Sequence, residues 1–173
     1  VTGNILVEMI HGESESLQIN AKNVDPSEVI TEVKDKLLVI KMRSNLFDDK
    51  AAVKIKLTYK EIREISSNAS AEIEVLGEII GDKIFATATS GGIIQMKVNL
   101  NAIEIKSYQG AHIDIQGNCK IQESFVNTGG VLSASNFKCD QVFIRMNTGG
   151  QAEVVANKKI EANVNTGAKL SFF

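Results

Sequence analysis

Residues 127–150 read NTGGVLSASNFKCDQVFIRMNTGG, so the tetrapeptide Asn-Thr-Gly-Gly both opens and closes this segment. Related tetrapeptides stand on either side, at Thr89-Ser90-Gly91-Gly92 and Asn165-Thr166-Gly167-Ala168. Weaker copies are Gln109-Gly110-Ala111 and Asn68-Ala69-Ser70, with Asn68 taken at the glycine position. The glycine anchors, spaced by 19, 19, 20 and 18 residues, are Gly91, Gly110, Gly129, Gly149 and Gly167. A repeat of this length indicates stacked supersecondary units.

Residues at fixed distances from each anchor share their chemistry. The residue after the anchor is Gly or Ala, and the third and fifth residues after it are apolar, as Ile94 and Met96 are after Gly91. The positions between them are mostly polar, and a second alternating segment precedes each anchor. This period of two is typical of strands with one buried face. Before Gly129, Gln122 occupies an inward position beside Ile121, which predicts a bulge or a one-residue slip.

Two short strands in about 19 residues cannot bury an apolar face alone, but stacked on similar neighbours they can. Helical repeats need a period of 3.6, which is absent here. The sequence therefore predicts an all-β fold, a parallel β-solenoid that is right-handed by the usual crossover preference.

The corners have an architectural explanation. Asn and Gly tolerate the positive φ angles of a sharp turn, and stacked asparagines can form a hydrogen-bonded ladder. The residues assigned to these structural corners are Gly91, Gly110, Asn127, Gly129, Asn147, Gly149, Asn165 and Gly167. No Gly-x-Gly-x-x-Gly or Gly-Lys-Ser/Thr motif accompanies them, so phosphate loops are not indicated.

Both cysteines fall at one position of the repeat. Cys119 lies ten residues before Gly129 and Cys139 ten before Gly149, which places them in one column on adjacent coils. Neither zinc nor redox motifs have this spacing. A disulfide and a pair of stacked thiols both remain open.

Residues 1–58 lack the anchor, and we expect irregular strands there that cap or start the solenoid, with regular coils over 59–173 in one continuous domain. Residues 44–50 form a polar segment that we expect to be a loop. The strands expected in this part span Ile5–Ile10, Ser16–Ala21, Val29–Val33, Lys36–Met42 and Val53–Tyr59.

Charge and hydropathy exclude several classes of protein. The net charge is −2 with no basic cluster, which argues against nucleic-acid binding. No apolar run approaches the length of a membrane span. The chain starts at Val1 without a signal peptide, from which we expect a removed leader or a piece of a longer chain.

The chain resembles the head GIN domain family, described as putative auto-transporter adhesins and found in exported proteins of Bacteroidetes-type bacteria. The resemblance rests on Gly3-Asn4-Ile5, Leu17-Gln18-Ile19, residues 31–35 (Thr-Glu-Val-Lys-Asp) with residues 37–40 after them, and the repeated corners. The family's corners are usually Ser-Gly-Ala or Ser-Gly-Ser, so the corners here differ in amino-acid sequence but not in stereochemistry. The resemblance implies a β-helical fold and a periplasmic, outer-membrane-associated or extracellular location. It carries no catalytic residues.

Few residues point to chemistry. His112 and Asp114 lie on one outward face, but no third metal ligand is visible, and no cofactor is expected. Glu104 and Glu123 face outward on neighbouring coils, at a separation near that of a retaining glycosidase. A solvated charge column, balanced by Lys106 and Arg145, is the favoured explanation of this carboxylate pair.

Large apolar side chains share the same outward strand, at Phe85, Phe125 and Phe143, and indicate a possible contact face. This face could be covered by the chain itself, by a second copy of the chain or by another molecule.

Three functions follow from these observations. The first is a non-catalytic envelope or extracellular module that binds a cell-surface glycan or protein. The alternatives are a glycosidase or lyase that uses Glu104 and Glu123, and a structural part of an envelope assembly.

Overall fold

The structure, a computed structural model, describes residues 1–43 and 52–173. The loop expected at residues 44–50 lies outside the described residues. Among these residues the only helix is the short 3₁₀ turn η1 (Pro26–Glu28), and the rest of the regular structure is β-strand. The predicted all-β class is therefore confirmed.

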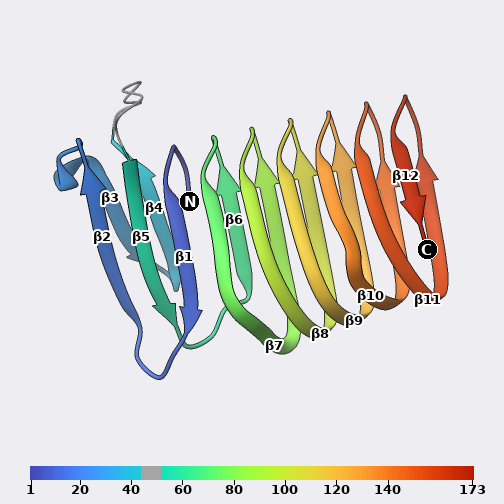
Figure 1. Cartoon of the computed structure of the whole chain (residues 1–173), viewed down its shortest axis with the longest axis horizontal. Helices are drawn as coiled ribbons and strands as arrows, with labels where there is room; N and C mark the ends of the chain where they lie inside the picture. Colours follow the sequence, from blue (N-terminus) through green and yellow to red (C-terminus); the bar gives the residue numbers. More distant parts are fainter. Residues whose placement is uncertain (44–51) are drawn as a thin grey trace.

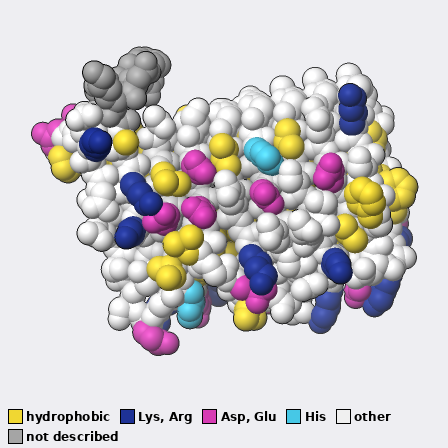
Figure 2. Space-filling view, viewed as in Figure 1, with side chains coloured by type: hydrophobic (Ala, Val, Ile, Leu, Met, Phe, Trp, Pro, Cys, Tyr) yellow, Lys and Arg dark blue, Asp and Glu magenta, His cyan; other side chains and the backbone are white. Residues whose placement is uncertain are grey.

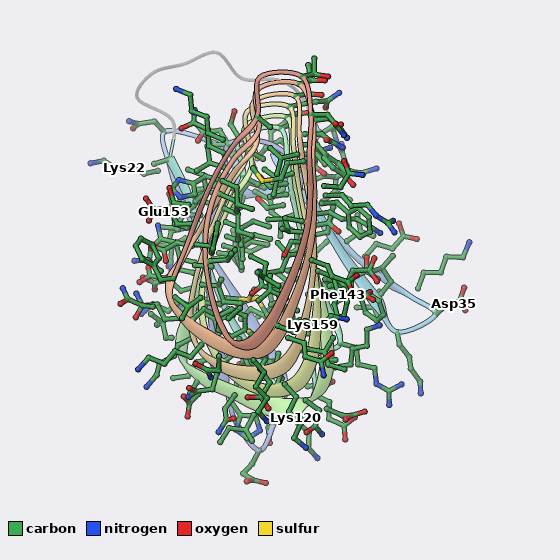
Figure 3. All side chains as sticks on the ribbon, turned by 90° about the vertical axis from the view of Figure 1, so that its right-hand side faces the viewer. Lys22, Asp35, Lys120, Phe143, Glu153 and Lys159 are labelled. Carbon is green, nitrogen blue, oxygen red and sulfur yellow. A yellow bond between two sulfur atoms is a disulfide. The ribbon has the colours of Figure 1, made fainter. Side chains whose placement is uncertain are left out.

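The long strands wind into a parallel β-solenoid (Figure 1), as predicted. They are β7 (Glu72–Thr89), β8 (Ile93–Tyr108), β9 (His112–Asn127), β10 (Val131–Met146) and β11 (Gln151–Val164), followed by the short β12 (Lys169–Phe172). Each long strand leaves a sharp corner, descends one side, rounds a broad bend and rises on the other side (Figures 1 and 3). We call the side formed by the first halves the front face and the side formed by the second halves the back face.

Like residues stack in the interior. Ile73 pairs with Ile94, Ile94 with Ile113, and Ile113 with Leu132, all in parallel register. Ile94, Ile113 and Leu132 are at most 1% exposed. The period-two alternation thus places a continuous apolar column between the two faces, and burial of such columns is the main stabilising contribution to a solenoid.

The slip predicted near Gln122 is wrong. Gln122 stays in register with Ile103 and Val142, and its side chain is fully buried. Its Nε2 donates a hydrogen bond of 2.9 Å to the buried Oγ of Ser124. A satisfied polar pair can occupy inward positions, because each group supplies the partner that water would otherwise give. The exposed neighbour is Ile121.

The corners are turns with two consecutive left-handed residues. At the corner of residues 127–130 these are Thr128 (φ 51°) and Gly129 (φ 71°), while Asn127 is not among the residues of positive φ. Gly130 N donates to Asn127 O within the turn, and Gly129 N donates to Thr148 O of the next corner. Successive corners are therefore held together by the main chain.

The predicted asparagine ladder is not present among the described residues. Asn127 Oδ1 is buried without a hydrogen-bond partner there, and Asn165 Nδ2 donates to Asn163. Among the described residues, side chains of neighbouring corners are joined by hydrogen bonds from Thr89 Oγ1 to Asn68 Oδ1, at 2.8 Å, and from Ser90 Oγ to Gln109 Oε1, at 2.9 Å. Asn68 thus occupies the position that asparagine takes in the later corners.

The first copy of the repeat was consequently misaligned by two residues. Ala69 and Ser70 carry the positive φ angles, and Ala71 N donates to Asn68 O, so Ser70 is the equivalent of the glycine anchors. A shift of two leaves every inward residue inward, because side chains alternate with a period of two.

The N-terminal part extends both faces. On the front, β1 (Leu6–His11) pairs in parallel with β7 and with β5 (Ala52–Tyr59), and β2 (Ser16–Lys22) adds to β5 in antiparallel fashion. On the back, β6 (Glu64–Asn68) pairs with the second half of β7. The antiparallel pair β3 (Val29–Lys34) and β4 (Leu37–Met42) forms a separate small sheet. Each of the five strands expected before residue 60 is present, with ends within one residue.

The last coil differs from the others. In the alternating segment before Gly167, the repeat predicts inward side chains at positions 160, 162 and 164. The structure leaves them partly or largely exposed: Val164 is 39% exposed, whereas its column neighbour Met146 is fully buried. The reason is that β12 pairs only with residues 151–154 of β11. Figure 2 shows hydrophobic side chains gathered at this end of the solenoid.

Candidate functional site: an aromatic band on the back face

The outward positions of the back face bring together the phenylalanines singled out in the sequence. One column runs Phe85, Glu104, Glu123, Phe143 and Glu161 in register. The adjacent column runs Thr87, Lys106, Phe125, Arg145 and Asn163. We call the outward surface formed by Phe85, Phe125, Phe143 and the charged residues around them the aromatic band.

Each phenylalanine of the band has a cation against its ring. Lys83 Nζ lies 4.6 Å from the Phe85 centroid, and Lys159 Nζ lies 5.4 Å from that of Phe143. Phe125 stands between Lys106 at 5.9 Å and Arg145 at 5.7 Å. Such contacts stabilise the ring orientation through the aromatic quadrupole. Figure 3, viewed along the solenoid axis, shows Phe143 and Lys159 on this side and Glu153 on the opposite side.

Acidic side chains complete the band. Glu104 Oε1 lies 2.7 Å from Lys106 Nζ in an ion pair, and Glu161 forms an ion pair with Lys159. The hydrogen bond to Glu104 raises the pKa of the Lys106 ammonium, so this cation stays charged to more alkaline pH than a free lysine. Burial raises the pKa of the nearby Tyr108 hydroxyl, which therefore stays neutral at physiological pH. The band is thus amphipathic and close to charge-balanced.

Glu104 and Glu123 are register partners on one sheet face. In glycosidases two carboxyl groups flank the scissile bond. Glu104 and Glu123 share one sheet face, and Glu104 is engaged in an ion pair with Lys106. One member of the pair is thus held by a neighbouring cation, as in the charge column considered from the sequence.

On the front face, His112 meets a residue that the sequence reasoning missed. His112 Nε2 lies 2.9 Å from Ser133 Oγ on the next coil. Ser133 is the register partner of Asp114 and not of His112. The signal was available, since Ser133 and His112 belong to adjacent outward columns of the repeat.

Cys119 and Cys139 are register partners with Cα atoms 4.6 Å apart, and their sulfurs form a disulfide. Both residues are buried. The Cys139 sulfur lies 3.5 Å from Gln122 Oε1, a contact without a hydrogen because the sulfur is oxidised. The bond joins the bends of β9 and β10.

Within the residues that the structure describes, no group of three or more His, Cys, Asp or Glu side chains has the arrangement of a metal site. No helix in residues 1–43 or 52–173 has the length and hydrophobicity needed to cross a bilayer.

Comparison with known proteins connects this architecture to a family. A family model described as "Putative auto-transporter adhesin, head GIN domain" matches residues 1–173. No curated protein matches the sequence.

Solved structures share the fold. A putative adhesin from Bacteroides fragilis is 14% identical, with a TM-score of 0.75 over 99% of this chain and 90% of that one. A putative adhesin from Parabacteroides distasonis is 18% identical, with a TM-score of 0.71 over 100% and 90% of the two chains. Another P. distasonis protein, described as a putative lipid binding protein, is 12% identical, with a TM-score of 0.64 over 99% and 90%.

Proposed function

The chain belongs to the head GIN domain family of putative auto-transporter adhesins, and from this premise we propose that it is a non-catalytic attachment module of the bacterial envelope or extracellular space. The observation that carries this proposal is the aromatic band. Phe85, Phe125 and Phe143 stand on an outward strand face, each held by a cation. Phe85 is exposed, and Phe125 and Phe143 are half-buried. Partly exposed aromatic side chains with flanking cations are typical of contact surfaces.

An exported location is part of the same proposal. Disulfides persist in oxidising compartments such as the periplasm and the cell exterior. The cross-coil bond between Cys119 and Cys139 fits that environment, and so does the family description.

The ligand class is tested by binding to immobilised surfaces. The probes are mucin, collagen, fibronectin, a glycan array and vesicles of phosphatidylethanolamine with phosphatidylglycerol. The vesicles are included because one structural relative is described as a putative lipid binding protein. We expect saturable binding to at least one glycan or protein surface. Absence of binding to every probe would overturn the proposal.

The enzymatic alternative is separated by a reducing-sugar release assay on the same glycans. We expect no product from the unmodified chain. Turnover that disappears in Glu104→Gln and Glu123→Gln, while an outward control such as Glu153→Gln retains it, would establish an enzyme instead.

Self-association through the aromatic band is a second candidate, favoured by the exposure of Phe85, at 39%. Light scattering of the unmodified chain and of Phe143→Asp distinguishes it. A mass that falls to the monomer only in Phe143→Asp supports assembly, and an unchanged mass removes this candidate.

A further inference from the structure

One edge of strand β7 lacks a partner strand over part of its length, in the middle of the molecule. On its N-terminal side, β7 pairs with β1 at residues 72–76 and with β6 at residues 85–89. Between these pairings, residues 77–84 have a ladder partner only in β8. The bends of β8, β9 and β10 are paired on both sides. Every second residue of a parallel ladder directs its N–H and C=O to the same neighbour, so this bend presents free main-chain groups.

A groove of about 770 Å³ lies along this free edge. One wall is the connector Lys60–Arg63 between β5 and β6, and the other is the bend of β7 from Glu78 to Phe85, at the lower edge of Figure 1. Buried apolar residues, among them Tyr59, Ile79 and Ile84, form the floor. The volume falls within the usual range of ligand pockets.

The rim of the groove exposes an apolar side chain. Ile80 is 75% exposed, the highest value among the large hydrophobic residues that the structure describes. Its register partner is Asn99, so no apolar neighbour on the next coil covers it. Ile80 therefore offers an apolar contact to any strand that pairs with the open edge beside it.

The charges of the groove favour an anionic partner. Two of its carboxylates are already engaged by the next coil: Glu78 with Lys97 at 3.5 Å and Asp82 with Asn101 at 2.8 Å. Lys60 and Arg63 have no ion pair among the described residues, and Lys83 lies over the Phe85 ring. Lys97 balances Glu78, whereas Asp82 is bonded to a neutral amide and keeps its charge. The remaining ionised side chains of the groove are three cations, Lys60, Arg63 and Lys83, against Glu61 and Asp82, an excess of one positive charge.

We propose that this groove binds an extended acidic peptide segment, which adds a strand to the free edge of β7 at Glu78–Lys83. Main-chain hydrogen bonds to the edge supply affinity, and acidic side chains on the partner meet Lys60, Arg63 and Lys83. An apolar side chain at an alternate position packs on Ile80. The site meets the aromatic band at Lys83 and Phe85, which belong to both, but it does not depend on the proposed attachment function.

The test uses a fluorescein-labelled heptapeptide that alternates glutamate and valine, titrated into the full chain and followed by fluorescence anisotropy. Hydrogen exchange followed by mass spectrometry reports main-chain pairing. We expect saturable binding, with slower exchange in peptides that cover residues 78–84. No binding up to millimolar peptide would overturn the proposal.

Two controls separate strand addition from charge attraction alone. The same heptapeptide with alternate amides N-methylated keeps every charge but cannot pair, and we expect it to bind at least about tenfold more weakly. Arg63→Glu with Lys83→Glu should weaken binding by a similar factor, whereas Lys120→Glu, on the bend of β9, should not. Equal binding of the N-methylated peptide, or an equal loss in Lys120→Glu, contradicts the site.

Discussion

At the residue scale, the corners place a residue type that avoids the left-handed region next to one that adopts it easily. Thr128, Thr148 and Thr166 all adopt φ near 50°, in the left-handed region that β-branched residues rarely occupy. The following glycines have φ of 71–72° at no steric cost. The turn is the type that asparagine followed by glycine fits best.

Replacing a corner threonine should therefore stabilise the protein. We expect Thr148→Asn to raise the free energy of unfolding by about 0.5–1 kcal/mol, because asparagine tolerates the left-handed region. Urea unfolding followed by circular dichroism measures the change. As a control, Thr87→Asn in the β7 strand should lower stability, since asparagine is disfavoured in strands. A loss of stability in Thr148→Asn would contradict this interpretation of the turn.

A second residue-scale prediction concerns the bend of β9. Gly117 has φ 110°, and a Cβ atom there would lie 2.0 Å from the carbonyl oxygen of Val98 on the previous coil. Gly117→Ala should lower the free energy of unfolding by about 3 kcal/mol or more, because main chain cannot move aside cheaply. Gly81→Ala is the matched control: its nearest neighbour is a Leu100 methyl group at 3.7 Å. Similar unfolding midpoints for the two variants would refute the close approach.

At the scale of the elements, the disulfide links the bends of two neighbouring coils. Cys119 and Cys139 enclose a loop with a sequence separation of 20 residues. In the chain-entropy account, closing such a loop contributes about 3 kcal/mol through the unfolded state.

The double variant Cys119→Ala with Cys139→Ala should therefore be less stable by about 3 kcal/mol, with unchanged strand content. Urea unfolding of the unmodified chain with reductant, equilibrated through the unfolded state, should shift in the same direction, and the variant should not respond to reductant. Coincident curves for the oxidised and reduced chains would show that the bond contributes nothing.

The repeat was predictable because its causes are local. Period-two alternation and the corner glycines specify strand, turn and inward face within each coil, and register then follows from stacking equal coils. The slip at Gln122 was predicted wrongly because the sequence does not show which group would satisfy a glutamine at an inward position. In the structure Ser124, two residues along on the same inward face, accepts its hydrogen bond.

Features that depend on two distant segments were not accessible in the same way. The bond between His112 and Ser133 crosses coils diagonally. The groove beside β7 exists because β1 and β6 come from separate segments and leave residues 77–84 uncovered. The cations of the aromatic band, such as Lys83 and Arg145, acquire their meaning only when the columns are placed side by side.

At the scale of the whole molecule, the two faces of the solenoid differ in character. The back face carries the aromatic band. At the front-face outward positions of β7 to β10, the side chains are polar, aliphatic or acidic, with His112 bonded to Ser133. A rigid stack of coils holds each face flat, which suits attachment to an extended surface more than enclosure of a small substrate.

The account predicts that attachment depends on the back face and not on the front. The decisive measurement is surface plasmon resonance on the strongest binder among the immobilised probes. It compares the double variant Phe125→Ser with Phe143→Ser on the back face against Ile93→Ser with Val131→Ser, which share one outward column of the front face. We predict that the back-face double variant loses at least about tenfold in affinity while the front-face double variant binds as the unmodified chain does. Equal affinities for the two variants, or a loss confined to the front-face variant, would contradict the account.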